Sequence, residues 1–231
     1  MSNTKNEIST IFVDCFNTII FRKVSTKDVF IEWAQRLSRI YSINWKTIYK
    51  TYKNINFKLC LKKIFTTFTL QEQFEVVLEK LFYSLSKKHN LGSLSNFIDC
   101  ATKKYVQTEL ENFYINENMI NYLKTEKDDG KKIYVVSDFY CKSNILTSWF
   151  TSLKINNIFE KIFSSSDFEK EKATTKIYKH LLNLLHLNPK NIIMYGDNVW
   201  SDVLMAKKCK LNAKRIKPKT ILNTQRNNYE K

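Results

Sequence analysis

The segment TIFVDCFNT at residues 10–18 joins a strand-sized apolar run to an aspartate. Thr10 to Val13 are β-branched or aromatic, which is typical of a strand buried in a parallel sheet. Asp14 follows directly, where such a strand would end. An acid at the carboxyl end of a buried strand is the pattern from which we predict the rest of the core.

Two later apolar runs have the same arrangement. Ile133–Val136 leads into a Ser-Asp pair at residues 137–138, and Ile192–Tyr195 leads into a Gly-Asp pair at residues 196–197. Each run precedes a segment with helical periodicity, and a shorter candidate strand covers Lys161–Ser164. Strands that alternate with helices predict an α/β fold with an open, Rossmann-like parallel sheet, whose functional residues lie at its carboxyl edge.

The stretch between the first two strands has a different pattern. From about Ser25 to Phe113 it contains no strand-sized run followed by an aspartate, and its apolar residues recur at helical spacing. We therefore predict an α/β core domain from residues 1–24 and 114–231, and an inserted helical cap subdomain from residues 25–113. The expected cap helices cover Lys27–Tyr41, Trp45–Phe57, Leu70–Leu85 and Leu94–Phe113.

The composition is that of a folded globular protein, with 43% hydrophobic and 14% aromatic residues. Apolar runs fall far short of the ~20 residues that a membrane-spanning helix needs. The segment Met1–Ser9 is polar and lacks the apolar stretch of a secretory signal. The 5 cysteines are odd in number and lack CxxC spacing, which favours reduced thiols over disulfides or a zinc site. We expect a cytoplasmic protein.

The formal net charge of +16 has two interpretations. A cationic surface can bind nucleic acid or acidic lipid, because binding releases counterions from the polyanion. The lysines, however, are scattered along the chain without a long basic block, which favours a compositional bias. We therefore expect neither a nucleic-acid nor a membrane partner, although a positive field would steer a small phosphorylated substrate toward a cleft.

Four short motifs, in order along the chain, resemble those of the haloacid dehalogenase (HAD) superfamily. Asp14 is followed four residues later by Thr18, and Ser137 ends the second strand. Lys172 stands ahead of a predicted helix, and the segment GDNVWSD at residues 196–202 contains two acids five residues apart. The first two motifs are weak by themselves and the last is moderately specific, whereas four ordered matches at successive strand ends are a strong signal.

The resemblance implies that Asp14 attacks a phosphate monoester and forms an aspartyl-phosphate. Ser137 would hydrogen-bond the transferring phosphoryl group, and Lys172 would offset the charge of Asp14 and the phosphate. These roles are chemically consistent, because a carboxylate attacks phosphorus only when the negative charge of the phosphate oxygens is neutralised. The implied catalytic residues are Asp14, Ser137 and Lys172.

The resemblance also implies a bound Mg²⁺ ion, which prefers oxygen ligands. The implied ligands are the side chains of Asp14, Asp197 and Asp202 and the backbone carbonyl of Phe16.

Three residues are candidates for substrate binding. Ser137 would contact the phosphoryl group, and Arg22 lies where the linker from the first strand to the cap would pass over the site. Asp138 follows Ser137 directly, and it is either an acid close to the substrate or a cap of the helix that begins near Lys142.

Each candidate also has a structural interpretation. Asp14, Asp197 and Ser137 could cap helices that follow strands, and Asp202 could cap a helix beginning near Val203. Lys170 and Lys176 flank Lys172, and the sequence does not tell which of these three lysines reaches the site.

Phe16 departs from the pattern of most phosphatases in the superfamily, which carry an acid/base aspartate two residues after the nucleophile. A phenyl ring cannot donate a proton to a leaving alkoxide. The chain is similar in this respect to HAD-like domains with an Asp-x-Phe-Asp-Thr first motif that are associated with polysaccharide biosynthesis, although Asn17 replaces their second aspartate.

Three functions therefore remain open. The first is a Mg²⁺-dependent phosphatase acting on a small phosphorylated metabolite, with a sugar phosphate among the candidates. The second is a dehalogenase-type C–X hydrolase, whose halide leaves without a proton, and the third is a catalytically impaired partner domain in a biosynthetic complex. The acids at positions 197 and 202 favour the phosphatase, because a small carboxylate substrate needs no magnesium.

Overall fold

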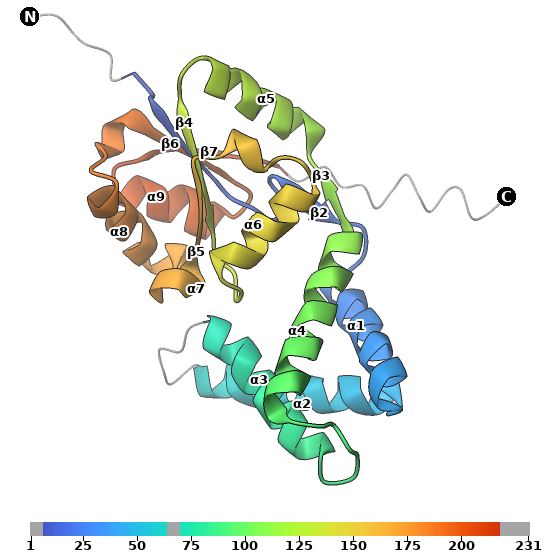
Figure 1. Ribbon diagram of the computed structural model, residues 1–231. Coiled ribbons are helices and arrows are strands. Elements are labelled where there is room, and N and C mark those ends of the chain that lie inside the picture. Colours follow the sequence, from blue (N-terminus) through green and yellow to red (C-terminus); the bar gives the residue numbers. More distant parts are fainter. Residues whose placement is uncertain (1–6, 64–69, 218–231) are drawn as a thin grey trace, which may run out of the picture.

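The computed structural model describes residues 7–63 and 70–217. Its core is a five-stranded parallel sheet with the strand order β5-β4-β1-β6-β7 (Figure 1). This arrangement confirms the predicted α/β fold with a Rossmann-like sheet. The strands are β1 (Thr10–Val13), β4 (Lys132–Ser137), β5 (Lys161–Ser164), β6 (Ile192–Gly196) and β7 (Asn212–Arg215).

The three predicted acid-bearing strands are neighbours at the centre of this sheet. Val13 of β1 is level with Val135 of β4 and with Tyr195 of β6. Because all three strands run in the same direction, the residues just beyond these positions gather at one edge of the sheet. Asp14, Ser137 and Asp197 therefore come from a single edge.

Helices cover both faces of the sheet, which explains why its central strands are apolar throughout. Ile11 and Val13 belong to one buried cluster, with Trp149 of α6, whereas Phe12 belongs to a second cluster with Tyr178 of α8. The alternation along β1 follows from the two-residue repeat of a strand. The helices of the core are α5 (Glu117–Asp128), α6 (Ser143–Ser152), α7 (Ser165–Phe168), α8 (Lys176–Leu184) and α9 (Met205–Lys208).

A helical cap is inserted after the first strand, as predicted, and Figure 1 shows it as a separate helical layer. Its helices pack through aromatic side chains, and the Trp33 indole donates a hydrogen bond of 2.8 Å to the Ala101 carbonyl. The exact domain boundaries stay a prediction. The cap helices are α1 (Thr26–Tyr41), α2 (Trp45–Lys63), α3 (Leu70–Leu85) and α4 (Leu94–Glu111).

Two short strands that the sequence pattern did not predict join the cap to the core. Strand β2 (Ile20–Arg22) pairs antiparallel with β3 (Phe113–Ile115). The expected helix over Leu94–Phe113 was therefore too long, because Phe113 leaves the helix to pair with Arg22. The expected helix over Trp45–Phe57 was too short, since α2 continues to Lys63.

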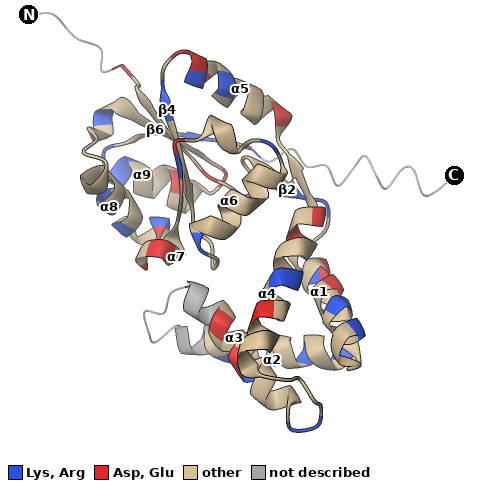
Figure 2. Ribbon diagram, viewed as in Figure 1, with Lys and Arg blue, Asp and Glu red and all other residues tan. Residues whose placement is uncertain are grey.

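Several further expectations concern location and charge. Within residues 7–63 and 70–217, no helix has the length and apolarity required to cross a membrane. Most of the Met1–Ser9 segment behind the cytoplasmic expectation lies outside the described residues. Figure 2 shows lysines and arginines on both the core and the cap, interspersed with acids. Among the cysteines whose side chains the structure describes, Cys15, Cys100, Cys141 and Cys209 are free, and the side chain of Cys60 lies outside the described part.

Candidate active site

Lys172 connects two aspartates at the carboxyl edge of the sheet. Its Nζ lies 2.5 Å from Oδ1 of Asp14 and 2.6 Å from Oδ1 of Asp202. All three side chains are at most 9% exposed, so the charges interact in a desolvated environment. Asp14 follows β1, Lys172 begins the 3-10 helix η2 (Lys172–Thr174), and Asp202 lies in the π-helix η4 (Val199–Leu204) after β6.

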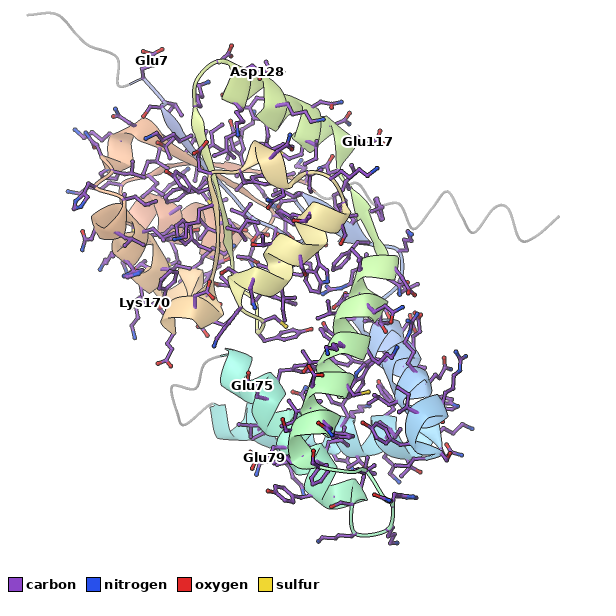
Figure 3. The ribbon with its side chains drawn as sticks, viewed as in Figure 1. Glu7, Glu75, Glu79, Glu117, Asp128 and Lys170 are labelled. Carbon is purple, nitrogen blue, oxygen red and sulfur yellow. The ribbon has the colours of Figure 1, made fainter. Side chains whose placement is uncertain are left out.

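This contact distinguishes Lys172 from its two neighbouring candidates. Lys176 is exposed on the first turn of α8. Lys170 lies near the outer surface beside α7 (Figure 3), and its ammonium donates to the Phe168 carbonyl at 3.3 Å. Lys172 is therefore the lysine that lies beside Asp14.

Three carboxylates form a cluster that suits a divalent cation. Asp14, Asp197 and Asp202 each offer an oxygen within 4.8 Å of the others. One ammonium cannot neutralise three carboxylates, and the excess negative charge fits a hard cation such as Mg²⁺. The position of the Phe16 carbonyl as a fourth ligand stays a prediction.

The electrostatics of Asp14 reflect this crowding. Burial, together with the charges of Asp202 and Asp197, raises the pKa of Asp14 from its ordinary 3.8 to about 7, against the opposing effect of Lys172. Burial also raises the pKa of Asp197. A bound cation would relieve the repulsion among the carboxylates, so the donor set fits the predicted metal.

Asp202 is held in place by the turn that precedes it. Its Oδ2 accepts a hydrogen bond of 3.0 Å from the backbone N–H of Asn198. The Asn198 side chain caps η4 by accepting from the N–H groups of Trp200 and Ser201. Asn198 is therefore the helix cap, and the alternative in which Asp202 capped a helix from Val203 was wrong.

Asn17 orients the remaining acid of the cluster. Its side-chain amide donates a hydrogen bond of 3.2 Å to Oδ2 of Asp197. Asn17 has a φ of 56°, in the left-handed region that asparagine tolerates better than most residues. From the sequence, Asn17 was identified only as the residue that replaces the second aspartate of the related first motif, and this contact was missed.

Ser137 has an unsatisfied hydroxyl at the same edge of the sheet. It is the last residue of β4 and is 0% exposed, and its Oγ has no hydrogen-bond partner within the part of the chain that the structure describes. A buried hydroxyl without a partner lowers stability unless a ligand completes it. This orphaned donor agrees with the predicted phosphoryl contact, which stays a prediction.

Asp138 positions the segment that carries Lys172. Both of its carboxylate oxygens accept from the backbone N–H of Lys172, at 2.9 and 3.1 Å. The N-cap of α6 is Lys142, without a side-chain hydrogen bond, so the cap interpretation of Asp138 was wrong. Its predicted contact with substrate stays untested.

Arg22 lies on β2 and forms an ion pair with a residue of the cap. Its Nε lies 2.7 Å from Oε2 of Glu109, and its Nη2 lies 2.8 Å from Oε1. The Arg22 Cζ lies 4.5 Å from the centre of the Phe16 ring. Glu109 is 0% exposed and also accepts a hydrogen bond from the Tyr105 hydroxyl.

Glu109 was missed by the sequence reasoning, although a signal was present. It lies on the buried face of α4 with Ala101 and Tyr105, at four-residue spacing. An acid on an apolar helix face requires a partner of opposite charge, and Arg22 is that partner.

Phe16 is part of an aromatic cluster at the position of the missing acid. Its ring lies 4.8 Å from Phe139, 5.9 Å from Phe113 and 6.5 Å from Trp149, measured between centroids. These contacts give the phenyl ring a packing role that an aspartate could not fill.

The protein is an α/β protein with an inserted helical cap, and it has a cluster of acids and a lysine at the carboxyl edge of its parallel sheet. A family model described as haloacid dehalogenase-like hydrolase matches residues 24–216, and the chain belongs to this family. The match begins after Asp14, so the first motif rests on its position in the fold. No sequence among the curated proteins matches the chain.

Solved structures with the same fold include two dehalogenases. A 2-haloacid dehalogenase from Pseudomonas syringae pv. tomato DC3000 has a TM-score of 0.66 and 12% identity, and the match covers 89% of this chain and 85% of that one. For the L-2-haloacid dehalogenase from Xanthobacter autotrophicus the values are 0.54 and 16%, with 90% and 77% covered.

Another similar structure is that of YfnB from Bacillus subtilis bound to magnesium, with a TM-score of 0.56, 15% identity, and 94% and 91% of the chains covered. At these identities the likeness shows the fold alone.

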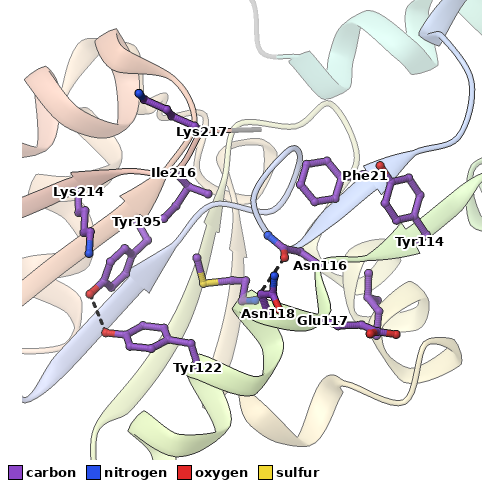
Figure 4. Close-up of a pocket in the computed structure, with 12 residues that line it drawn as sticks. Phe21, Tyr114, Asn116, Glu117, Asn118, Tyr122, Tyr195, Lys214, Ile216 and Lys217 are labelled. Carbon is purple, nitrogen blue, oxygen red and sulfur yellow. Dashed lines mark hydrogen bonds between the residues drawn. The ribbon is translucent and has the colours of Figure 1, made fainter. Parts of the chain in front are cut away.

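The structure also contains a cavity of about 620 Å³ (Figure 4). It is lined by the β2–β3 ribbon, the start of α5 and the end of β7. The hydroxyls of Tyr122 and Tyr195 hydrogen-bond at 2.7 Å in its wall. None of the predicted site residues is among those that line it, so we assign it no part in the chemistry.

Proposed function

We propose that this HAD-like hydrolase is a Mg²⁺-dependent phosphatase that acts on a small phosphorylated metabolite. The supporting observation is the cluster of Asp14, Asp197 and Asp202 beside Lys172. Three carboxylates around one ammonium suit a divalent cation, and a cation with a lysine is what neutralises an incoming phosphate.

In this proposal the Asp14 carboxylate attacks phosphorus, and the bond from phosphorus to the leaving-group oxygen breaks. Water then hydrolyses the aspartyl-phosphate, which releases inorganic phosphate and regenerates the carboxylate. Ser137 donates a hydrogen bond to a phosphoryl oxygen, and Lys172 holds Asp14 and offsets negative charge. Asp14, Asp197 and Asp202, with the Phe16 carbonyl, are the residues that would hold Mg²⁺.

The leaving group determines how fast this reaction can be. Phe16 occupies the position from which a general acid would protonate the departing oxygen, and its ring packs against Phe139. The proton then comes from water, and substrates with weakly basic leaving groups react fastest.

Hydrolysis of a carbon–halogen bond is a second candidate. The observation that favours it is the same Phe16, since a halide departs without a proton. The cluster of Asp14, Asp197 and Asp202 disfavours this candidate, because attack on a small carboxylate substrate needs no magnesium site.

Parallel assays of phosphate and chloride release test the two candidates. We expect Mg²⁺-dependent turnover of p-nitrophenyl phosphate that EDTA abolishes and that Asp14→Asn reduces at least about 10³-fold. Asp99→Asn, at an exposed acid of α4 that pairs with Lys103, is the matched control and should retain full activity. Chloride release from 2-chloropropionate without phosphatase activity would reject the proposal, as would a folded protein inactive in both assays.

A further inference from the structure

Six residues between the nucleophile loop and the cap form a closed series of contacts, which we term the leaving-group ring. Its members are Phe16, Arg22, Tyr105, Glu109, Phe139 and Tyr140. Phe16 and Phe139 are 4.8 Å apart between centroids, Phe139 and Tyr140 are 4.2 Å apart, and Tyr140 and Tyr105 are 5.8 Å apart. The Tyr105 hydroxyl, Glu109 and Arg22 close the series back to the Phe16 ring.

The ring is adjacent to the proposed chemistry through the chain itself. Phe16 lies two residues after Asp14, and Tyr140 lies three residues after Ser137. Tyr105 and Glu109 come from cap helix α4, so the ring lies where the cap meets the core. A group leaving from a phosphorus held by Asp14 and Ser137 would therefore have these side chains as its neighbours.

Two hydrogen-bond donors of the ring lie outside its internal hydrogen bonds. The Tyr140 hydroxyl is buried and finds no hydrogen-bond partner among the described residues. Arg22 donates from Nε and Nη2 to Glu109, so its Nη1 takes no part in this two-point contact. The Arg22 side chain is 21% exposed. An orphaned hydroxyl that phenylalanine could replace without loss of packing indicates a ligand contact more than a structural one.

The charge of the ring limits what this ligand can be. Glu109 neutralises Arg22 through a two-point contact, so the ring carries no net charge with which to hold a second anion. Its remaining surface consists of aromatic rings, which pack against the C–H faces of a flat or cyclic group. Donors next to aromatic faces without net charge fit a neutral group that carries oxygen acceptors.

We propose that the leaving-group ring binds the neutral, hydroxyl-bearing part of the substrate, with Tyr140 as a specificity-determining donor, so that the substrates are monophosphates of polyols or sugars and not of acids. This inference rests on the proposed phosphatase function and extends it to the substrate class.

Tyr140→Phe tests the inference, because it removes only the orphaned hydroxyl. The matched control is Tyr122→Phe, which removes a hydroxyl from the cavity of Figure 4. We expect wild-type protein with Mg²⁺ to hydrolyse hexose and pentose monophosphates with higher kcat/KM than 3-phosphoglycerate or phosphoserine. Tyr140→Phe should raise KM for the preferred sugar phosphate by about tenfold, and it should raise KM by less for phenyl phosphate, whose ring carries no acceptor for the Tyr140 hydroxyl, with the melting temperature unchanged.

Binding to the Asp14→Asn variant separates this inference from the function on which it rests. We expect sugar phosphates with Mg²⁺ to raise the melting temperature of Asp14→Asn, and the added Tyr140→Phe change to reduce this rise. This result would support the proposed role of the ring even if p-nitrophenyl phosphate were not hydrolysed. Preference for the acid phosphates, or an equal KM change for the sugar and aryl substrates, would overturn it. Turnover of aryl phosphate with no effect of Tyr140→Phe on any sugar phosphate would overturn the ring and leave the phosphatase function standing.

Discussion

The Gly196 backbone and the Asp202 side chain lie so close together that one more carbon atom would not fit between them. A Cβ built on Gly196, the last residue of β6, would overlap the carboxyl group of Asp202. The backbone at residue 196 can therefore approach the acid only because it carries no side chain. This close approach sets the position of Asp202 relative to Lys172.

Gly196→Ala should displace Asp202 and weaken cation binding. We expect a loss of about 1–3 kcal/mol in the free energy of unfolding, as for other overpacked sites, and a smaller stabilisation by Mg²⁺ than in the wild type. Urea denaturation with and without Mg²⁺ measures both effects. Gly130→Ala is the control, because Gly130 has a φ of 84° and open space around its Cβ: it should lose stability but keep its response to Mg²⁺.

Of the three candidate lysines at positions 170, 172 and 176, Lys172 should be the one whose substitution by Met destabilises the protein most. Lys172→Met removes the ammonium between Asp14 and Asp202 and leaves buried acids without their partner, which costs about 3–5 kcal/mol. Mg²⁺ should recover more stability in this variant than in the wild type, because the cation replaces the missing charge. Lys176→Met, at an exposed position, should change stability by no more than about 0.5 kcal/mol. Equal losses in the two variants would contradict the buried pairing.

Mg²⁺ should stabilise the wild-type protein against unfolding. A ligand that binds only the folded state contributes about 2.7 kcal/mol at one hundred times its Kd. Asp197→Asn should remove most of this gain, and Asn17→Ala should reduce it, because the Asn17 amide holds Oδ2 of Asp197. Melting curves recorded over a Mg²⁺ titration give the comparison, with Asp99→Asn as a variant that keeps the full effect. Stabilisation by Mg²⁺ that persists in full in Asp197→Asn would place the cation elsewhere.

The strand ends could be predicted from the sequence because a parallel strand is a local signal. Asp14, Ser137 and Asp197 each follow an apolar run, and parallel strands bring such positions to one edge. Lys172 was harder, because three lysines lie within seven residues and only the fold shows which one is buried. Glu109 and Arg22 are 87 residues apart in the chain. Their pairing depends on the antiparallel β2–β3 ribbon, whose strands are too short to give a periodic signal.

Phe16→Asp should not create a better phosphatase, although it restores the acid found at this position in most phosphatases of the superfamily. The ring lost from position 16 packs against Phe139 and Trp149, so the substitution should cost about 3 kcal/mol or more. The Arg22 guanidinium, which now lies over the Phe16 ring, is already paired with Glu109 and would not fix a carboxyl at position 16 beside the leaving oxygen. A carboxyl that is not held beside the leaving oxygen cannot protonate it efficiently.

We therefore expect the ratio of alkyl to aryl phosphate turnover in Phe16→Asp to stay within about twofold of the wild-type ratio. A general acid that worked would raise this ratio by about 10²-fold or more. Phe16→Leu separates the two effects, because it removes the aromatic ring without adding a charge and should lose stability with the same substrate ratio. A large rise in alkyl phosphate turnover in Phe16→Asp alone would show that a carboxyl at position 16 can act as the acid without the aromatic packing, and it would contradict this prediction.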